Sequence, residues 1–280
     1  MDHYPPSTLT SEKLPPGSDS MQRLVVHLDL FSGIGGFALA AKMAGGIKTA
    51  AFCEIDPWAR QVLAKNFPNV PICEDVKTLD PKDYGTINLI TAGYPCQPFS
   101  LSGERRGAAD DRHLWPEVLR ITKQARPRWV LCENVVGHFT LGLDEVLDDL
   151  EGIGYACAPP AIVPACAVGM WHRRDRVWII AHDTRQHIQE SQVVDTEEML
   201  SESRRVADAS RLRVAGWEAD QPSMVGVAHG IPHWVDRSRG TGNAIVPEVA
   251  AEILRCMMRV DSLHNVQTEG SAESAIPEPY

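Results

Sequence analysis

The chain has 280 residues, of which 44% are hydrophobic and 23% charged, an ordinary globular composition with length for one large domain and a small one. Its formal net charge of -10 argues against a protein wrapped in nucleic acid, although a local basic patch can still bind phosphates. No apolar run reaches the roughly 18 residues of a membrane span, and residues 1–20 lack the blocks of a secretory signal, so we expect a cytoplasmic protein.

Short apolar runs typical of strands alternate with helical patterns along most of the chain. Strands are expected near 24–31, 49–54, 87–92, 128–132 and 176–181, and helices in FALAAKMAG, PWARQVLAKNF, LWPEVLRITKQA and LDEVLDDLEGIG. This alternation predicts an α/β fold built on a doubly wound, Rossmann-like sheet.

The composition divides the chain into a main domain, a small module and two tails. Residues 1–20 and 263–280 are polar and are expected to be flexible tails. The main domain is expected at 21–182 and is completed by 237–262, where helical spacing returns in VPEVAAEILRCMMRV. Between them, 183–236 loses the pattern and is expected to form a small separate module or a mobile insert.

A glycine-rich loop follows the first predicted strand in DLFSGIGGFALA. Gly33, Gly35 and Gly36 let the chain turn tightly and let a nucleotide-like ligand approach the backbone. With Ala38 the loop also satisfies the dinucleotide pattern, so a nicotinamide cofactor stays open on this motif alone. In either case Glu54, at the end of the second strand, is expected to accept hydrogen bonds from ribose hydroxyls.

Asp75 and Val76 lie just past a possible third strand. There the carboxylate can accept from an adenine amino group while the valine covers the ring. Taken alone, Asp75 also fits a solvated loop acid or a cap.

The next predicted strand ends in GYPCQPFSLSG, which places Cys96 in a loop between two prolines. The carboxyl end of a strand is where α/β sheets hold their ligands. The prolines favour an extended, presented loop, whereas a structural cysteine more usually sits inside a helix or strand. A nucleophile is therefore favoured over a core cysteine at this position.

No metal site is assigned. The seven cysteines are scattered without CxxC pairs, which indicates neither a disulfide framework nor a zinc knuckle. His229 and His233 have a spacing that suits a metal on a helix, but Pro232 between them disfavours one.

Five motifs, FSGIGG, PCQPFS, ENV, RRDRVWII and GNAIVP, occur in the order and spacing of the DNA cytosine-5 methyltransferase family. The chain resembles compact bacterial or phage members of this family over about 24–182 and 237–260. The resemblance implies methyl transfer from S-adenosyl-L-methionine to carbon 5 of cytosine in double-stranded DNA, by a monomer, in the setting of restriction-modification. It also implies that the target base is flipped out of the duplex.

The resemblance assigns the catalytic residues. Cys96 resembles the thiolate that adds to carbon 6 of the base. Glu133 occupies the position of the acid that protonates ring nitrogen 3, which requires a carboxyl partly protonated near neutrality. Asn134 would orient the carboxyl or the loop, or simply form a turn. Arg176 would hold the carbonyl oxygen of the cytosine and the catalytic loop, and Arg174 would reach phosphate.

The cofactor positions implied by the resemblance lie on the glycine loop, after the second and third strands, before Cys96 and in the last motif. They are Phe31, Ser32, Gly33, Gly35, Gly36, Glu54, Ile55, Asp75, Val76, Pro95, Asn243 and Ala244. Phe31 is expected against the adenine and Pro95 near the sulfonium, with Asn243 and Ala244 closing over the methionine part.

The chain departs from the family pattern in two places. Trp171 and His172 stand where the family usually has Pro-Gln, which leaves the role of that glutamine unfilled. The stretch 183–236 is short for a target-recognition domain and lacks the family's ninth motif. Its candidate DNA contacts are Arg204, Arg205, Arg211, Arg213 and Trp217, and Arg105 and Arg106 belong to an expected lid after Cys96.

Three other functions compete with this one. A similar motif set can methylate a cytosine in transfer RNA, and a catalytically inactive relative can simply bind nucleic acid. Against the inactive relative stand the intact Cys96, Glu133 and Arg176. A nicotinamide oxidoreductase leaves PCQPFS and ENV unexplained.

Overall fold

The structure of the protein is a computed structural model that describes residues 24–95, 114–140, 142–185 and 242–270, the last of these by backbone alone from 262 on. The predicted N-terminal tail and nearly all of the predicted module 183–236 lie outside these residues.

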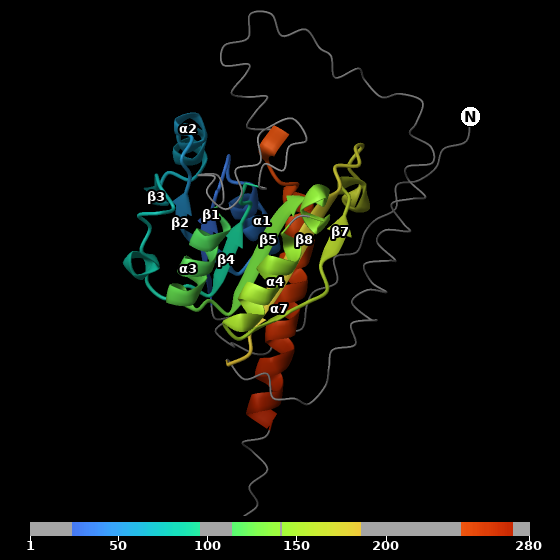
Figure 1. Ribbon diagram of the computed structural model, residues 1–280. Coiled ribbons are helices and arrows are strands. Elements are labelled where there is room, and N and C mark those ends of the chain that lie inside the picture. Colours follow the sequence, from blue (N-terminus) through green and yellow to red (C-terminus); the bar gives the residue numbers. More distant parts are fainter. Residues whose placement is uncertain (1–23, 96–113, 141, 186–241, 271–280) are drawn as a thin grey trace, which may run out of the picture.

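The described residues form one eight-stranded sheet in the order β3-β2-β1-β4-β5-β8-β6, with β7 also paired to β8 (Figure 1). The neighbours from β3 to β5 are parallel, whereas β8 runs antiparallel to β5, β6 and β7. The strands are β1 Val25–Leu30, β2 Ile47–Cys53, β3 Ile72–Cys73, β4 Leu89–Ala92, β5 Trp129–Val135, β6 Tyr155–Cys157, β7 Ala161–Val163 and β8 Arg176–Asp183. All five predicted strands are therefore confirmed, and so is the doubly wound sheet.

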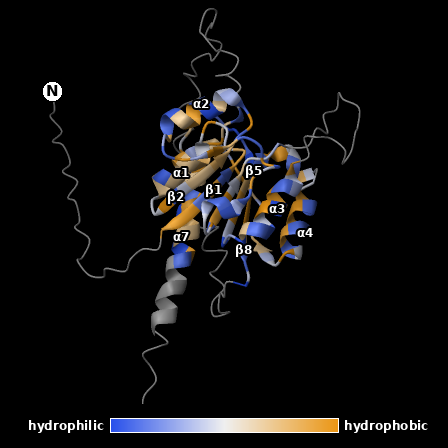
Figure 2. Cartoon of the chain, turned by 90° about the vertical axis from the view of Figure 1, so that its left-hand side faces the viewer, coloured by the Kyte–Doolittle hydropathy of each residue, from blue (hydrophilic) through white to orange (hydrophobic). Residues whose placement is uncertain are grey.

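Helices cover both faces of this sheet. They are α1 Gly36–Ala44, α2 Pro57–Asn66, α3 Trp115–Ala125, α4 Leu143–Gly152 and α7 Pro247–Gly270, with 3₁₀ turns η1 Pro81–Tyr84, η3 Val136–Thr140 and η4 Ala165–Val168. Seen edge-on, α3 and α4 lie on one side of the strands and α1 and α7 on the other (Figure 2). The molecule is a three-layer α/β domain of this kind because each face of the sheet buries apolar side chains.

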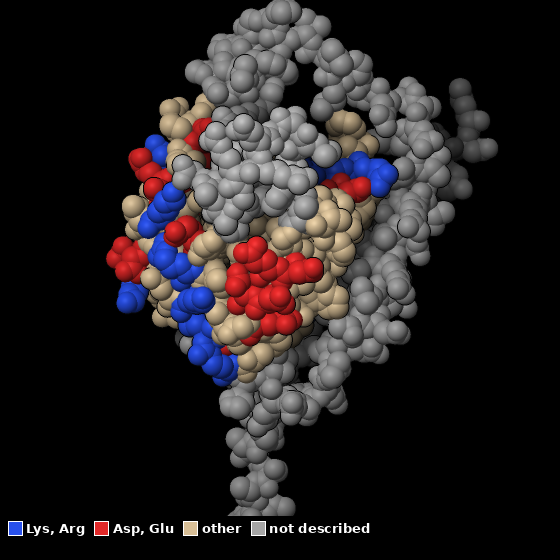
Figure 3. Space-filling view, in the orientation of Figure 1, with Lys and Arg blue, Asp and Glu red and all other residues tan. Residues whose placement is uncertain are grey.

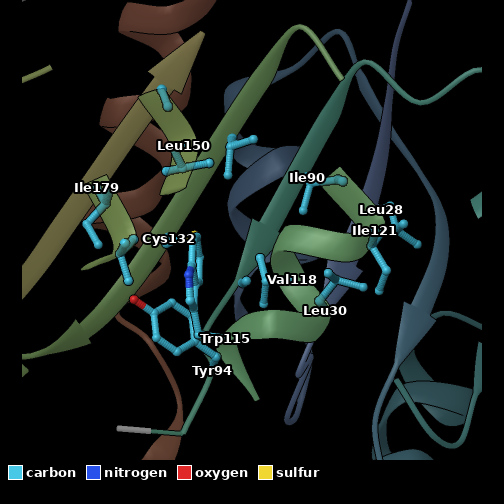
Figure 4. Close-up of a cluster of buried hydrophobic side chains, with 14 of the residues drawn as sticks. Leu28, Leu30, Ile90, Tyr94, Trp115, Val118, Ile121, Cys132, Leu150 and Ile179 are labelled. Carbon is cyan, nitrogen blue, oxygen red and sulfur yellow. The ribbon is translucent and has the colours of Figure 1, made fainter. Parts of the chain in front are cut away.

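Two large apolar cores fill the layers, and a smaller cluster is formed by Ala38, Phe52 and Leu63. Under α3 and α4, one core takes in Leu28, Leu30 and Ile90 of the strands with Val118 of α3 and Leu150 of α4 (Figure 4). Alternate strand residues point to opposite faces, so their neighbours on the sheet contribute to the second core beneath α1 and α7. That core includes Phe37, Leu131, Trp178, Val249 and Leu254.

A buried polar chain crosses the middle of the sheet. The His27 ring is hydrogen-bonded to Thr49 at 3.0 Å and to Thr91 at 2.7 Å, and the Thr91 hydroxyl donates to Asp29 Oδ1 at 2.8 Å. Burial lowers the pKa of His27 to about 3 and raises the pKa of Asp29 to about 8. Both groups are therefore uncharged near neutral pH, and they link β2, β1 and β4 at the point where the strand order reverses.

The C-terminal helix extends beyond the predicted domain end. α7 begins at Pro247, as expected of a proline in a first helical turn, but it continues to Gly270. The helix thus runs into the stretch 263–280 expected as a flexible tail, and that expectation stays a prediction. Once a helix is nucleated each further residue adds a hydrogen bond at small cost, so polar residues can continue it without an apolar pattern. None of the helices in the described part of the chain is long and apolar enough to cross a membrane.

Candidate active site

The glycine loop joins β1 to α1 at the place where the strand order reverses, which is the usual ligand site of such sheets. Phe31 and Gly33 have φ of 54° and Gly35 has φ of 92°. A Cβ placed on Gly33 would meet nothing within 4 Å, so the loop is open there. A Cβ on Gly36 would lie 2.6 Å from Ile245 Cγ1, which means that the glycine allows the last motif to rest on the loop.

Glu54 ties the end of β2 to this loop. Its Oε2 accepts from the Gly33 N–H at 2.6 Å and its Oε1 from the Asp56 N–H at 2.8 Å. Each carboxylate oxygen keeps a further lone pair, so the group can still accept from a ligand hydroxyl. Beside it, Ile55 is 72% exposed and offers apolar surface.

Three other predicted cofactor residues take part in the fold itself. The buried Ser32 hydroxyl donates to the Asp29 carbonyl at 2.7 Å and accepts from the Cys53 N–H at 3.2 Å, which braces β1 against β2. Asp75 Oδ1 accepts from the Lys77 N–H at 2.9 Å, so it caps a turn. Val76 is buried in the core under α3, which leaves little of it to contact a ligand.

Pro95 is exposed at the end of the described segment that follows β4, and Cys96 lies outside the described residues. In the last motif Asn243 is exposed and Ala244 half-buried. The candidate nucleic-acid contacts Arg105, Arg106, Arg204, Arg205, Arg211, Arg213 and Trp217, with His229 and His233, also lie outside the described residues.

Glu133 and Arg176 meet across the antiparallel pair of β5 and β8. Glu133 is opposite Trp178 and Arg176 is opposite Val135, so the two side chains are diagonal neighbours on one face. Arg176 Nε lies 2.9 Å from Glu133 Oε1. Burial raises the pKa of Glu133 to about 7, although the charges of Arg176 and Arg174 oppose the rise. This carboxyl is therefore partly protonated near neutral pH.

Asn134 holds the chain just ahead of Cys96. Its Nδ2 donates to the Tyr94 carbonyl at 3.2 Å, and its Oδ1 accepts from the Val135 N–H at 2.9 Å. The Tyr94 hydroxyl is hydrogen-bonded to His138 Nε2 at 2.8 Å, and its ring packs on Trp115 with centroids 5.3 Å apart. Sequence reasoning missed these aromatic residues, whose only signal was a tyrosine at the end of a buried strand next to the PCQ motif.

Arg174 contacts the last motif through one guanidinium nitrogen, and its expected contact with phosphate stays a prediction. Its Nη2 donates to the Gly242 carbonyl at 2.7 Å and to the Ala244 carbonyl at 2.5 Å. The residue has φ of 37°, an uncommon backbone conformation for a side chain other than glycine. Arg174 is therefore joined to the last motif rather than to the Glu133 carboxylate.

No group of three or more His, Cys, Asp or Glu side chains that could hold a metal occurs in the described ranges. Acidic side chains gather instead on the outer surface of α4, from Asp144, Glu145, Asp148 and Glu151 (Figure 3). This face repels phosphate, so nucleic acid is expected to bind elsewhere on the molecule.

The sequence of the chain is similar to those of known methyltransferases over about half of its length. The Type II methyltransferase M2.BsuMI of Bacillus subtilis is 34% identical over 163 residues, 55% of this chain and 41% of that protein. The Type II methyltransferase M.NgoMIV of Neisseria gonorrhoeae is 39% identical over 159 residues, 55% of this chain and 50% of that protein. The matched region thus spans about half or less of these curated relatives.

The fold is similar to that of DNMT2 from Spodoptera frugiperda, with a TM-score of 0.52 and 24% identity over 61% of this chain and 54% of that chain. The sequence model of a family described as C-5 cytosine-specific DNA methylase matches residues 25–219. Since that match takes in well over half of the 280 residues, the chain belongs to the C-5 cytosine-specific DNA methylase family.

Proposed function

We propose that the protein transfers a methyl group from S-adenosyl-L-methionine to carbon 5 of a cytosine in double-stranded DNA. The observation that carries this proposal is the buried Glu133 carboxyl, with a pKa of about 7 and a partner in Arg176. An acid whose pKa lies near the working pH is well suited to give and retake a proton. The membership of the family and the names of its Type II relatives support DNA as the substrate.

The residues around the glycine loop fit the cofactor. Gly33 leaves its backbone open, Glu54 can accept from ribose hydroxyls, and the exposed Ile55 offers an apolar contact for the adenine. When bound, S-adenosyl-L-methionine supplies a methyl group on a positively charged sulfur. Pro95, exposed beyond β4, would border this methyl group.

Cys96 and Glu133 divide the chemistry on the base. The Cys96 thiolate adds to carbon 6 while Glu133 gives its proton to ring nitrogen 3, so that carbon 5 becomes nucleophilic and takes the methyl group. Loss of the carbon-5 proton to solvent, return of the ring proton to Glu133 and expulsion of the thiolate then restore the ring. Arg176, which pairs with Glu133, would bind the carbonyl oxygen of the same base.

The burial of Glu133 implies that the target cytosine is flipped out of the duplex. Glu133 is 7% exposed, and a cytosine stacked in a duplex presents neither carbon 6 nor nitrogen 3 to a buried group. The nucleotide must therefore rotate into the site. In this account the lid after Cys96 and the module 183–236 contact the DNA, the latter through its arginines and Trp217.

A covalent trap tests the proposal. DNA of varied sequence that carries 5-fluorocytosine is incubated with the protein and S-adenosyl-L-methionine, and adducts are counted on a denaturing gel. Fluorine blocks the loss of the carbon-5 substituent, so the wild type should accumulate an adduct. Cys96→Ala should form none, while the matched cysteine variant Cys256→Ala should behave as the wild type. An adduct that persists in Cys96→Ala, or no adduct and no methyl transfer by the wild type, would overturn the proposal.

A further inference from the structure

Two segments far apart in the sequence meet at Arg174. One Nη2 nitrogen donates to the carbonyls of Gly242 and Ala244, which lie 68 and 70 residues further along the chain. Both acceptors are backbone groups in the turn that precedes α7. The contact therefore fixes the path of the chain in this turn, whatever side chains the turn carries.

The same turn rests on the glycine loop from its other side. Ile245 is 9% exposed and packs in the core beneath α1 and α7. Its Cγ1 takes the space that a Cβ on Gly36 would need. The segment 242–246 is thus held between an arginine and the loop that would contact the cofactor.

We infer that Arg174 is a positioning residue that fastens segment 242–246 over the glycine loop, and that it acts on cofactor binding rather than on DNA phosphate. The inference rests on the proposed function for its cofactor. Two residues on, at the start of β8, Arg176 pairs with Glu133. Residues 174–176 thus join segment 242–246 to the acid.

The electrostatics favour this role. Arg174 is half-buried next to a second guanidinium, Arg176, and burial together with that like charge lowers its pKa. Carbonyl dipoles at 2.7 and 2.5 Å offset the cost of a cation in this place. The two carbonyls take up the Nη2 group, so an anion at Arg174 could use only Nε and Nη1.

The test compares Arg174→Gln with Arg173→Gln, a matched control whose side chain is 83% exposed and paired only locally with Asp175. Hydrogen exchange of peptides covering 242–250 is measured without cofactor, and S-adenosylhomocysteine binding is measured by calorimetry without DNA. Arg174→Gln should speed exchange and weaken binding by about tenfold or more, the usual effect of losing a charged hydrogen-bond donor. Arg173→Gln should change neither.

A second variant approaches the turn from the other side. Ile245→Ala should weaken S-adenosylhomocysteine binding as well, and the double variant with Arg174→Gln should lose less than the product of the two effects, because both act through one segment. Independent, multiplicative effects would contradict the inference. So would unchanged exchange at 242–250, or a loss confined to DNA affinity with a smaller salt dependence. If Arg174→Gln speeds exchange but the wild type binds no S-adenosylhomocysteine, Arg174 does hold segment 242–246. That result would refute the proposed function instead.

Discussion

At the scale of single residues, the balance of burial and charge at Glu133 sets the protonation of the site. The carboxyl is 7% exposed, and its loss of hydration outweighs the attraction of Arg176 at 2.9 Å. A raised pKa means that the protonated form dominates below about 7 and is lost as pH rises through that value. In the proposed mechanism, Glu133 would therefore carry its proton on the acid side of neutrality.

The rate of methyl transfer should follow this titration. We expect kcat of the wild type to fall as pH rises above about 7, because Glu133 then loses its proton. Glu133→Gln should lower kcat by roughly 10²- to 10⁴-fold and abolish this alkaline decline. Single-turnover rates measured across the pH range provide the check, with the exposed Glu145→Gln as control. An alkaline decline that survives in Glu133→Gln would assign the titration to another group.

Position 36 has no room for a side chain, because Ile245 fills the space that a Cβ would need. Gly36→Ala places a Cβ 2.6 Å from Ile245 Cγ1, and we expect a loss of about 1–3 kcal/mol in the free energy of unfolding. Gly152→Ala, where a Cβ meets nothing within 4 Å, should have little effect. Urea unfolding measures both. Combining Gly36→Ala with Ile245→Ala should cost less than the sum of the two, and full additivity would refute the clash.

At the scale of elements, the sequence predicts the long apolar strands and the amphipathic helices but misses what is short or set by distant partners. β6 and β7 have three residues each, too few to show an alternating pattern. The pairing of Glu133 with Arg176 could be anticipated, since both lie in motifs of one family. The contacts of Arg174 with Gly242 and of Tyr94 with His138 could not, because nothing local in either segment marks its partner.

The start of α2 provides a test at this scale. Asp56 caps the helix, since its Oδ1 accepts from the Trp58 N–H at 2.8 Å and the Ala59 N–H at 3.0 Å. Asp56→Ala should lower the free energy of unfolding by about 1 kcal/mol, while Asp56→Ser should retain most of the stability. Thermal and urea unfolding can show the difference. Equal losses in the two variants would mean that the cap contributes nothing.

At the scale of the whole molecule, the first and last described helices share the core on one face of the sheet. Phe37 and Ala41 of α1 pack with Val249 and Leu254 of α7, although these residues are separated by most of the chain. The expectation that 237–262 completes the main domain stays a prediction, and α7 begins within this range. The C-terminal end of α7 could not be predicted, because the residues that continue the helix to Gly270 are polar and show no helical pattern of apolar residues.

The shared core should make the domain unfold as one unit. Leu254 is fully buried, so Leu254→Ala should cost about 2–5 kcal/mol of the free energy of unfolding in one cooperative transition. Leu39→Ala, at a position that is 44% exposed on α1, should cost far less. Urea unfolding followed by tryptophan fluorescence and by circular dichroism tests both points. A transition that separates into two steps would show that α7 is not integral to the domain.

The central claim is that this chain methylates carbon 5 of cytosine in DNA. Its most direct test is to express the protein in a host without cytosine methylation and to map methylcytosine in the host DNA at base resolution. We expect methylcytosine in one recurring sequence context with the wild type and none with Cys96→Ala. Host DNA free of methylcytosine despite folded protein, or the same methylation pattern with Cys96→Ala, would contradict it.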